Sequence, residues 1–395
     1  MADAPRKLSH YFTHSKRKGR AGLPLMSVTM HDGLVRRDSL DRKTDSALKD
    51  EEHLLVEPGD IAYNMMRMWQ GALGLADEAA NVSPAYGVMR PKNTVDPRFA
   101  KHWFKSDRGL YMLWAYSYGL TEDRLRLYPK EFLRVPVDWP SRQRQSEIAD
   151  VLDHWDQAIA IVSATIERRE ALRRAVARTV FPLKRDFGAL ERPSKFCVGD
   201  LGRIIRGISY DPNEDLADEG VGVLTAAHVL NGEVTLLPSW NVVRSAATQP
   251  AQLMRAGDFL IAMSNGSKAL VGKAGLMRSD PAVPLGAGAF CATLRPRDAL
   301  SRRVLDHAFG SERYKELLHV ELAGSSIGNL TAGDLRGFEF YWSGDESELA
   351  VLDGLRLLIR KDTDRLARLQ LQKRAIMQQL FPDEHPQPVE SEMLT

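Results

Sequence analysis

Two stretches of this sequence repeat one another at a fixed distance, and the repeat limits the possible folds more than any other feature. Val151-Leu152-Asp153 returns as Val351-Leu352-Asp353, 200 residues later. Phe181-Pro182 returns at the same offset, as Phe381-Pro382. A repeat of this length is typical of a duplicated structural unit. We therefore predict that the chain is built from two copies of one unit.

Around these repeats the apolar residues recur at alternating spacings of three and four, which places them on one stripe of a long helix. We expect one long helix in residues 141–183 and a second in 345–382, each ended by its proline. We predict that the two helices pair antiparallel through these positions: Leu152, Ile159, Ile166, Arg173, Val176, Ile359, Asp362, Leu366, Leu369 and Ile376. Aligning the centres of the two helices brings Arg173 to Asp362, two charges that would each be costly in an apolar seam without a partner. The alternative is that both side chains reach the edge of the seam and stay solvated.

The segment before each helix has the pattern of a small mixed globule. Residues 57–63 (E-P-G-D-I-A-Y) and 255–261 (R-A-G-D-F-L-I) both place a Gly-Asp turn before an apolar strand. Short strands dominate both globules, and short helices are expected after them. The predicted fold class is α+β, with the order 1–140 globule, 141–183 helix, 195–344 globule, 345–382 helix and 383–395 flexible tail.

Composition and motifs favour a binding protein over an enzyme. The formal net charge of +2 is too small to indicate nucleic-acid binding by itself. The segment from Gly266 to Gly272-Lys273-Ala274 has one residue too many for a phosphate-binding loop and lacks its hydroxyl. The ten histidines lack metal-ligand spacing, and the two cysteines fit a reducing cytoplasm. We expect no catalytic residue, no metal ligand, no bound cofactor and no membrane contact.

The pattern as a whole resembles the specificity subunits of type I restriction–modification systems. The resemblance rests on the two long helices that end in Phe-Pro, on the Gly-Asp strands, and on residues 63–74 (Y-N-M-M-R-M-W-Q-G-A-L-G) followed by 82–86 (V-S-P-A-Y). It departs from the family in the first globule, where no counterpart of Val198-Gly199-Asp200-Leu201 is found. The N-terminal part of this domain is therefore expected to be shortened, with its first strand either missing or rebuilt from the basic N-terminal arm.

This resemblance implies a function and a set of partners. Each globule would be a target-recognition domain that reads one half of a split sequence in double-stranded DNA. The helices would separate the domains and bind two modification subunits, which carry adenine methyltransferase activity and S-adenosylmethionine. Restriction subunits, which combine motor and nuclease and use ATP, would join them. The alternative is a coiled-coil interaction scaffold that does not bind DNA.

Candidate DNA contacts follow from the loop after each Gly-Asp strand. Side chains with paired donors and acceptors can read base edges, and the candidates for this are Asn64, Arg67, Gln70, Ser264, Asn265, Ser267 and Lys268. The alternative for the first loop is that its methionines and Trp69 belong to the core, with the polar residues on the opposite face. Phosphate contacts are expected from Lys16, Arg17, Lys18, Arg36, Arg37, Arg124, Arg206 and Lys273.

Overall fold

The chain forms two compact α+β units, each of which contains parts of both long helices. The computed structural model describes residues 5–40, 48–121, 124–183, 194–237, 239–323 and 328–382. The first unit contains residues 1–163 and 364–395, and the second contains residues 164–363. The tail 383–395, which we expect to be flexible, lies outside the described residues. Every described helix is too short or too polar to span a lipid bilayer.

The described residues of the first unit form two four-stranded sheets, the strand pair of β1 (Arg6–Lys7) and β10 (Pro136–Val137), and three short α-helices. One sheet has the order β2-β9-β6-β7, with bounds Phe12–His14, Tyr86–Pro91, Ile61–Asn64 and Leu73–Leu75. The other has the order β4-β3-β8-β5, with bounds Leu34–Arg36, Leu25–Val28, Ala80–Val82 and Leu54–Val56. The short helices are α1 (Pro97–Phe104), α2 (Asp107–Ala115) and α3 (Pro129–Phe132).

The second unit repeats the first sheet. Its six-stranded sheet has the order β12-β21-β17-β19-β15-β14, with bounds Gly202–Arg206, Cys291–Pro296, Phe259–Ala262, Ala274–Leu276, Glu233–Val234 and Val229–Leu230. A second sheet has the order β16-β13-β20, with bounds Asn241–Val243, Leu216–Leu224 and Leu285–Ala287. The unit also contains helices α5 (Val198–Leu201), α6 (Ala299–Ala308), α7 (Glu312–Ala323) and α8 (Ala332–Gly337).

The strand that the sequence pattern does not reveal is present in the first unit. Strand β1 (Arg6–Lys7) pairs antiparallel with β10 (Pro136–Val137). Strand β11 (Ser194–Cys197) pairs in the same way with β23 (Glu339–Trp342) in the second unit. The N-terminal element is therefore only shorter than its counterpart. Two residues are too few to produce a periodic pattern, so the sequence could not show this strand.

The two Gly-Asp motifs form the same turn. Gly59 and Gly257 adopt positive φ angles of 91° and 93°, a backbone conformation that favours glycine. The following carboxylates, Asp60 and Asp258, are almost fully buried. Each accepts a backbone N–H three residues earlier, at 3.0 Å in both units. Arg295 lies 2.7 Å from Asp258 and balances its buried charge. In both units the glycine and the aspartate thus fix the turn that leads into the central strand.

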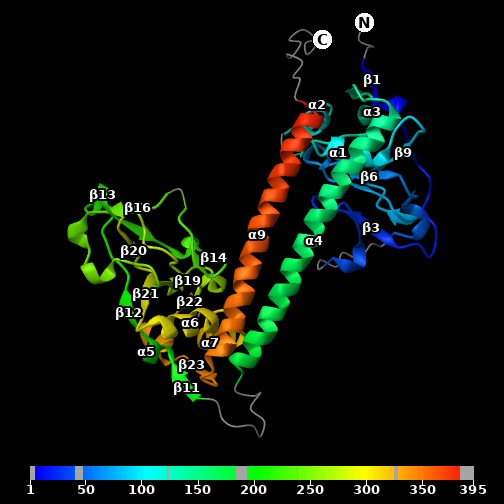
Figure 1. Ribbon diagram of the computed structural model, residues 1–395. Helices are drawn as coiled ribbons and strands as arrows, with labels where there is room; N and C mark the ends of the chain where they lie inside the picture. Colours follow the sequence, from blue (N-terminus) through cyan, green and yellow to red (C-terminus); the bar gives the residue numbers. More distant parts are fainter. Residues whose placement is uncertain are drawn as a thin grey trace. The chain divides into compact units, whose positions relative to one another are not determined.

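The two long helices, α4 (Arg142–Val180) and α9 (Glu346–Leu380), are drawn in Figure 1 in green and orange-red. All ten positions proposed for pairing are buried or half-buried. By contrast, Ile161 and Leu371 on the same helices are 67% and 65% exposed. The stripe of spacing three and four is therefore the covered side of each helix.

The predicted pairing of Arg173 with Asp362 is wrong. In the second unit Asp362 forms its ion pair with Arg169, and Arg173 bonds Glu170 at 3.0 Å on its own helix. In the first unit the helices are joined by the ion pair of Lys373 with Asp156. The prediction aligned the centres of the two helices. It did not consider that the ends of the helices pack into the globular cores, which shifts the register between them. Phe381 packs on Phe99 with ring centroids 5.6 Å apart, and this contact contributes to the register.

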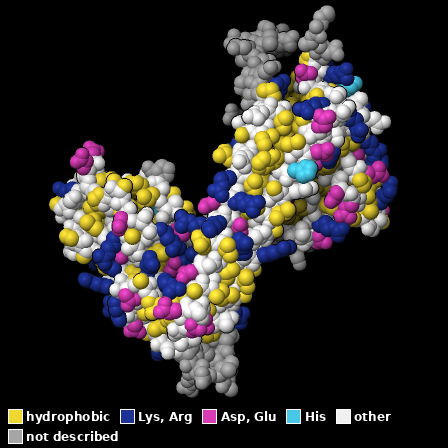
Figure 2. Space-filling view, viewed as in Figure 1, with side chains coloured by type: hydrophobic (Ala, Val, Ile, Leu, Met, Phe, Trp, Pro, Cys, Tyr) yellow, Lys and Arg dark blue, Asp and Glu magenta, His cyan; other side chains and the backbone are white. Residues whose placement is uncertain are grey.

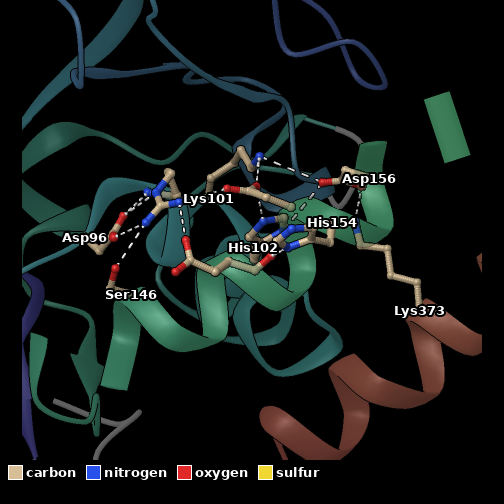
Figure 3. A network of polar contacts seen from close by, with 10 residues as sticks. Asp96, Lys101, His102, Ser146, His154, Asp156 and Lys373 are labelled. Atoms are coloured by element: carbon tan, nitrogen blue, oxygen red, sulfur yellow. Dashed lines mark hydrogen bonds and ion pairs between the residues drawn. The ribbon is translucent and has the colours of Figure 1, made fainter. Parts of the chain in front are cut away.

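A buried histidine connects the short helix of each unit to its long helix. In the first unit His102 Nε2 lies 2.8 Å from Asp153 Oδ1, between α1 and α4 (Figure 3). In the second, His307 Nε2 lies 2.8 Å from Asp353 Oδ1, between α6 and α9. Burial, together with Lys101, lowers the pKa of His102 to about 4. Burial and Arg356 lower the pKa of His307. Both rings are therefore neutral at pH 7.

Stability is expected to fall on mild acidification. An unfolded histidine takes up a proton near pH 6.5, whereas buried His102 resists protonation down to about pH 4, so protons favour the unfolded state over this range. Between about pH 7 and pH 5 the free energy of unfolding should drop by roughly 1–2 kcal/mol for this residue. The measurement is urea unfolding at several pH values.

The matched variants are His102→Gln, which keeps an N–H donor without titrating, and His319→Gln at an exposed histidine. His102→Gln should flatten the pH dependence, and His319→Gln should leave it unchanged. An unaltered slope in His102→Gln would show that the buried ring does not cause the pH dependence.

Candidate nucleic-acid interface

The two predicted reading loops occupy the same place in the two units. The first loop, residues 64–70, joins β6 to β7 and contains the short 3₁₀ turn Met68–Gln70. The second predicted loop, residues 264–268, follows β17. Its first two residues form the short strand β18 (Ser264–Asn265), which pairs antiparallel with β22 (Gly328–Asn329), and the segment then leads into the 3₁₀ turn Lys268–Leu270 before β19. Strands β6 and β17 occupy equivalent positions in their sheets, so two rigid strands support each loop.

An asparagine shapes each loop from within. Asn64 Oδ1 accepts the backbone N–H of Met66 at 3.0 Å, and Asn265 Oδ1 accepts that of Ser267 at 2.9 Å. This asparagine-type turn mimics a backbone turn and holds the following residues. The amide oxygens of both candidates are therefore occupied within the loop, and their Nδ2 groups are the part that could face a base.

In the first loop Arg67 and Gln70 carry the accessible polar groups. Both side chains are exposed, and neither has a side-chain hydrogen bond or ion pair to any described residue. Met68 is fully buried, whereas Met66 is 50% exposed. Met68 therefore belongs to the core, as the alternative interpretation of this loop has it. The loop still presents the guanidinium of Arg67 and the amide of Gln70 to solvent.

The second loop presents a different chemistry. Ser264 Oγ donates to the carbonyl of Gly328 at 3.3 Å, and Lys268 Nζ donates to that of Leu322 at 3.4 Å. Ser267 is exposed beside them. The second loop therefore offers a hydroxyl and an ammonium group, where the first offers a guanidinium and an amide.

Two of the proposed phosphate contacts are held in ion pairs inside the first unit. Arg17 lies 2.8 Å from Glu57 and 3.4 Å from Asp60, and Arg36 lies 2.9 Å from Glu78. Their charges are balanced within the fold, which weakens the case for phosphate binding. The other candidates are exposed, except for half-buried Arg37: Lys16, Lys18, Arg124, Arg206 and Lys273.

Two surface features are missed by reading the sequence, and the first lies beside the second loop. Phe290 is 72% exposed, and its carbonyl accepts the N–H groups of Met263 and Ser264 at 2.9 and 3.1 Å. An exposed aromatic ring directly beside the second loop could stack on a base or enter a base step. No local signal marks this residue, because a phenylalanine between apolar runs reads as core.

The second feature is basic. Figure 2 shows Lys and Arg side chains gathered along α9, which has exposed Arg360, Lys361, Arg365 and Arg368. Exposed Asp364 lies among these four residues, so the segment carries a net positive charge, which is suited to phosphate groups. The basic residues are visible in the sequence, but this helix was interpreted only through its apolar seam, as a partner of the other long helix.

One group of possible metal ligands exists among the described residues, and its geometry indicates an ion network. Donor atoms of His102, Asp153 and Asp156 lie within 4.8 Å of one another. Lys101 Nζ lies 3.2 Å from Asp153, and Lys373 forms an ion pair with Asp156 (Figure 3). These ammonium groups already neutralise the carboxylates at the places where a cation would bind.

Part of the chain is similar in sequence to a curated protein. The Type I restriction enzyme StySPI specificity subunit of Salmonella potsdam is 29% identical over 136 residues, which are 34% of this chain. The match spans only 29% of that relative's length. No family model matches the chain.

Two solved structures share the fold over nearly the whole chain. The S subunit of a type I restriction–modification system from M. genitalium has a TM-score of 0.61 at 15% identity and covers 98% of both chains. A chain from a study of complex assembly and conformational transition of the type I R-M system has a TM-score of 0.54 at 17% identity. It covers 98% of this chain and 99% of its own. The resemblance inferred from the sequence is confirmed.

Proposed function

We propose that this chain is the specificity subunit of a type I restriction–modification enzyme, a non-catalytic protein that reads a bipartite DNA target. The observation that carries the proposal is the duplicated unit, in which an exposed polar loop follows the central strand of each sheet. Likeness in fold to type I S subunits over 98% of the chain supports it.

Each unit is proposed to read one half of the target. Arg67 and Gln70 suit guanine and adenine edges, whereas Ser267 and Lys268 offer other donors, so the two half-sites should differ. Exposed basic residues would contact phosphates and set the position of the duplex without reading sequence.

The long helices are proposed to pair as an antiparallel coiled coil between the two recognition domains. The ion pairs Asp156–Lys373 and Arg169–Asp362 support this, since a later residue of α4 meets an earlier residue of α9. The 39 and 35 residues of α4 and α9 correspond to about 58 and 52 Å of helix. Two modification subunits, which would bring S-adenosylmethionine, and restriction subunits, which would bring ATP, are proposed as partners in the cytoplasm.

Methylation mapping of genomic DNA tests this function. Cells that carry the chain with its co-expressed modification subunits should show adenine methylation at two short, unlike blocks separated by a fixed gap. Exchanging residues 1–140 for the corresponding domain of another such subunit should change one block only. Omitting the modification subunits should abolish methylation, because the chain itself is proposed to lack catalysis.

A single contiguous palindrome, or an exchange that alters both blocks, would contradict the proposal that each domain reads one half of the target.

Salt dependence separates this function from the scaffold alternative. A DNA-binding complex loses affinity linearly in the logarithm of salt concentration, because phosphate contacts release counterions. A scaffold would show no such binding.

A further inference from the structure

The contacts between short and long helix share an arginine and a histidine that meet one carboxylate in each unit, and they include an ion pair whose charges are exchanged between the units. On α1 and α6, Arg98 corresponds to Arg303 and His102 to His307. Arg98 lies 3.5 Å and Arg303 2.9 Å from the equivalent carboxylates Asp153 and Asp353. The buried histidines bond the same two carboxylates at 2.8 Å. This shared set would let either short helix dock on either long helix.

At the remaining position the signs are opposite. In the first unit Lys101 on α1 lies 3.2 Å from Asp153 and 3.8 Å from Asp156 on α4. The equivalent residues in the second unit are Asp306 on α6 and Arg356 on α9, which form an ion pair. The cation comes from the short helix in one unit and from the long helix in the other.

We propose that this exchanged pair assigns each domain to its own long helix. If α1 docked on α9, Lys101 would face Arg356. If α6 docked on α4, Asp306 would face Asp156. Both incorrect arrangements replace an attractive contact by a like-charge contact while every shared contact is kept. The surface of each long helix therefore accepts one domain of this chain and rejects the other: α4 accepts the domain with α1, and α9 accepts the domain with α6.

Burial makes the discrimination effective. The Asp306 side chain is 9% exposed and that of Arg356 is 26% exposed, so solvent screens their interaction poorly. Surrounding cations also favour these signs, because Arg278 lies 3.5 Å from Asp306 and Lys373 pairs with Asp156. A like charge beside Asp306 would have to be buried without a partner, which is strongly destabilising. Asp156 is 42% exposed, so solvent screens a like charge at the first junction more strongly.

The first test uses full-length variants of equal net charge. The variant K101D/D306K creates the like-charge contacts of incorrect docking at both junctions. The variant K101D/D156R/D306K/R356D restores opposite charges within the two exchanged pairs, although position 101 then faces Asp153, position 156 faces Lys373 and position 306 faces Arg278 with like charge. We expect the first variant to lower Tm by about 5–10 °C and the second to recover part of that loss. The control R144E/E147R exchanges an exposed pair on α4 and should leave Tm unchanged.

Equal stability of K101D/D306K and the parent chain would overturn the proposal, and so would a fourfold variant no more stable than the double variant. If the double variant fails to fold while the fourfold variant folds, the expected rescue has occurred. Failure of both would count against the proposal, since restored charge complementarity would then have no effect.

A second test separates domain assignment from simple stabilisation. A chain in which a second copy of residues 5–140 replaces residues 194–344 places Lys101 opposite Arg356. In this chimaera Arg356→Asp should raise Tm, whereas in the parent chain the same substitution should lower it. The proposal fails if the substitution changes stability in the same direction in both. If the chimaera folds neither with Arg nor with Asp at position 356, the proposal is judged on the charge-exchange variants of the first test.

Discussion

Phe381→Ala is expected to lower the free energy of unfolding of the first unit by about 3–5 kcal/mol, since it removes a large ring from a packed core. Phe381 is 6% exposed and belongs to the core cluster of the first unit, which also contains Leu152 of α4. Its ring lies 5.6 Å from that of Phe99. A residue at the end of α9 thus completes a core formed mostly by the first 152 residues.

Hydrogen exchange of the full-length chain is the measurement that locates this effect. Peptides from residues 97–140 should lose protection in Phe381→Ala, and peptides from the second unit should not. Leu371→Ala, at an exposed position of the same helix, is the matched control and should change stability by less than about 0.5 kcal/mol. Unchanged protection of residues 97–140 would mean that the first core does not depend on Phe381.

Arg67→Ala and Lys268→Ala are each expected to weaken DNA binding by about 1–3 kcal/mol, roughly 10- to 100-fold, and to relax one block of the target only. This expectation depends on the proposed function. Arg67 lies on the first loop and Lys268 on the second, so the two variants should affect different half-sites. The loss is expected because a well-placed cationic side chain can read guanine in the major groove.

Binding is measured by fluorescence anisotropy with the assembled complex and duplexes changed in one block at a time. Lys315→Ala is the control, because that exposed side chain pairs with Glu312 on its own helix, lies outside the proposed contacts and should change affinity less than threefold. If Arg67→Ala and Lys268→Ala weaken binding to every duplex equally, the two side chains contact phosphates and do not read bases.

The strands and turns that carry the candidate residues could be located from the sequence, because strand patterns and turn residues are local. The Gly-Asp motifs at Gly59 and Gly257 led to the correct central strands and to the loops that follow them. The roles of individual side chains were less accessible. The asparagine oxygens are occupied by backbone N–H groups of the loop, and Arg17 meets Glu57, 40 residues away. Such contacts depend on distances that no local pattern encodes.

The sequence by itself determined the duplication, the two long helices and the covered stripe of each. These features follow from periodicity and from proline, whose effects act within a few residues. The tertiary structure alone decided the contacts between the helices and the pairing of charges. Asp362 meets Arg169 where a centred alignment predicts Arg173, and Lys101 and Asp306 occupy equivalent positions with opposite charges. The physical reason is that the globular cores hold the helix ends, and those cores bring together residues distant in sequence.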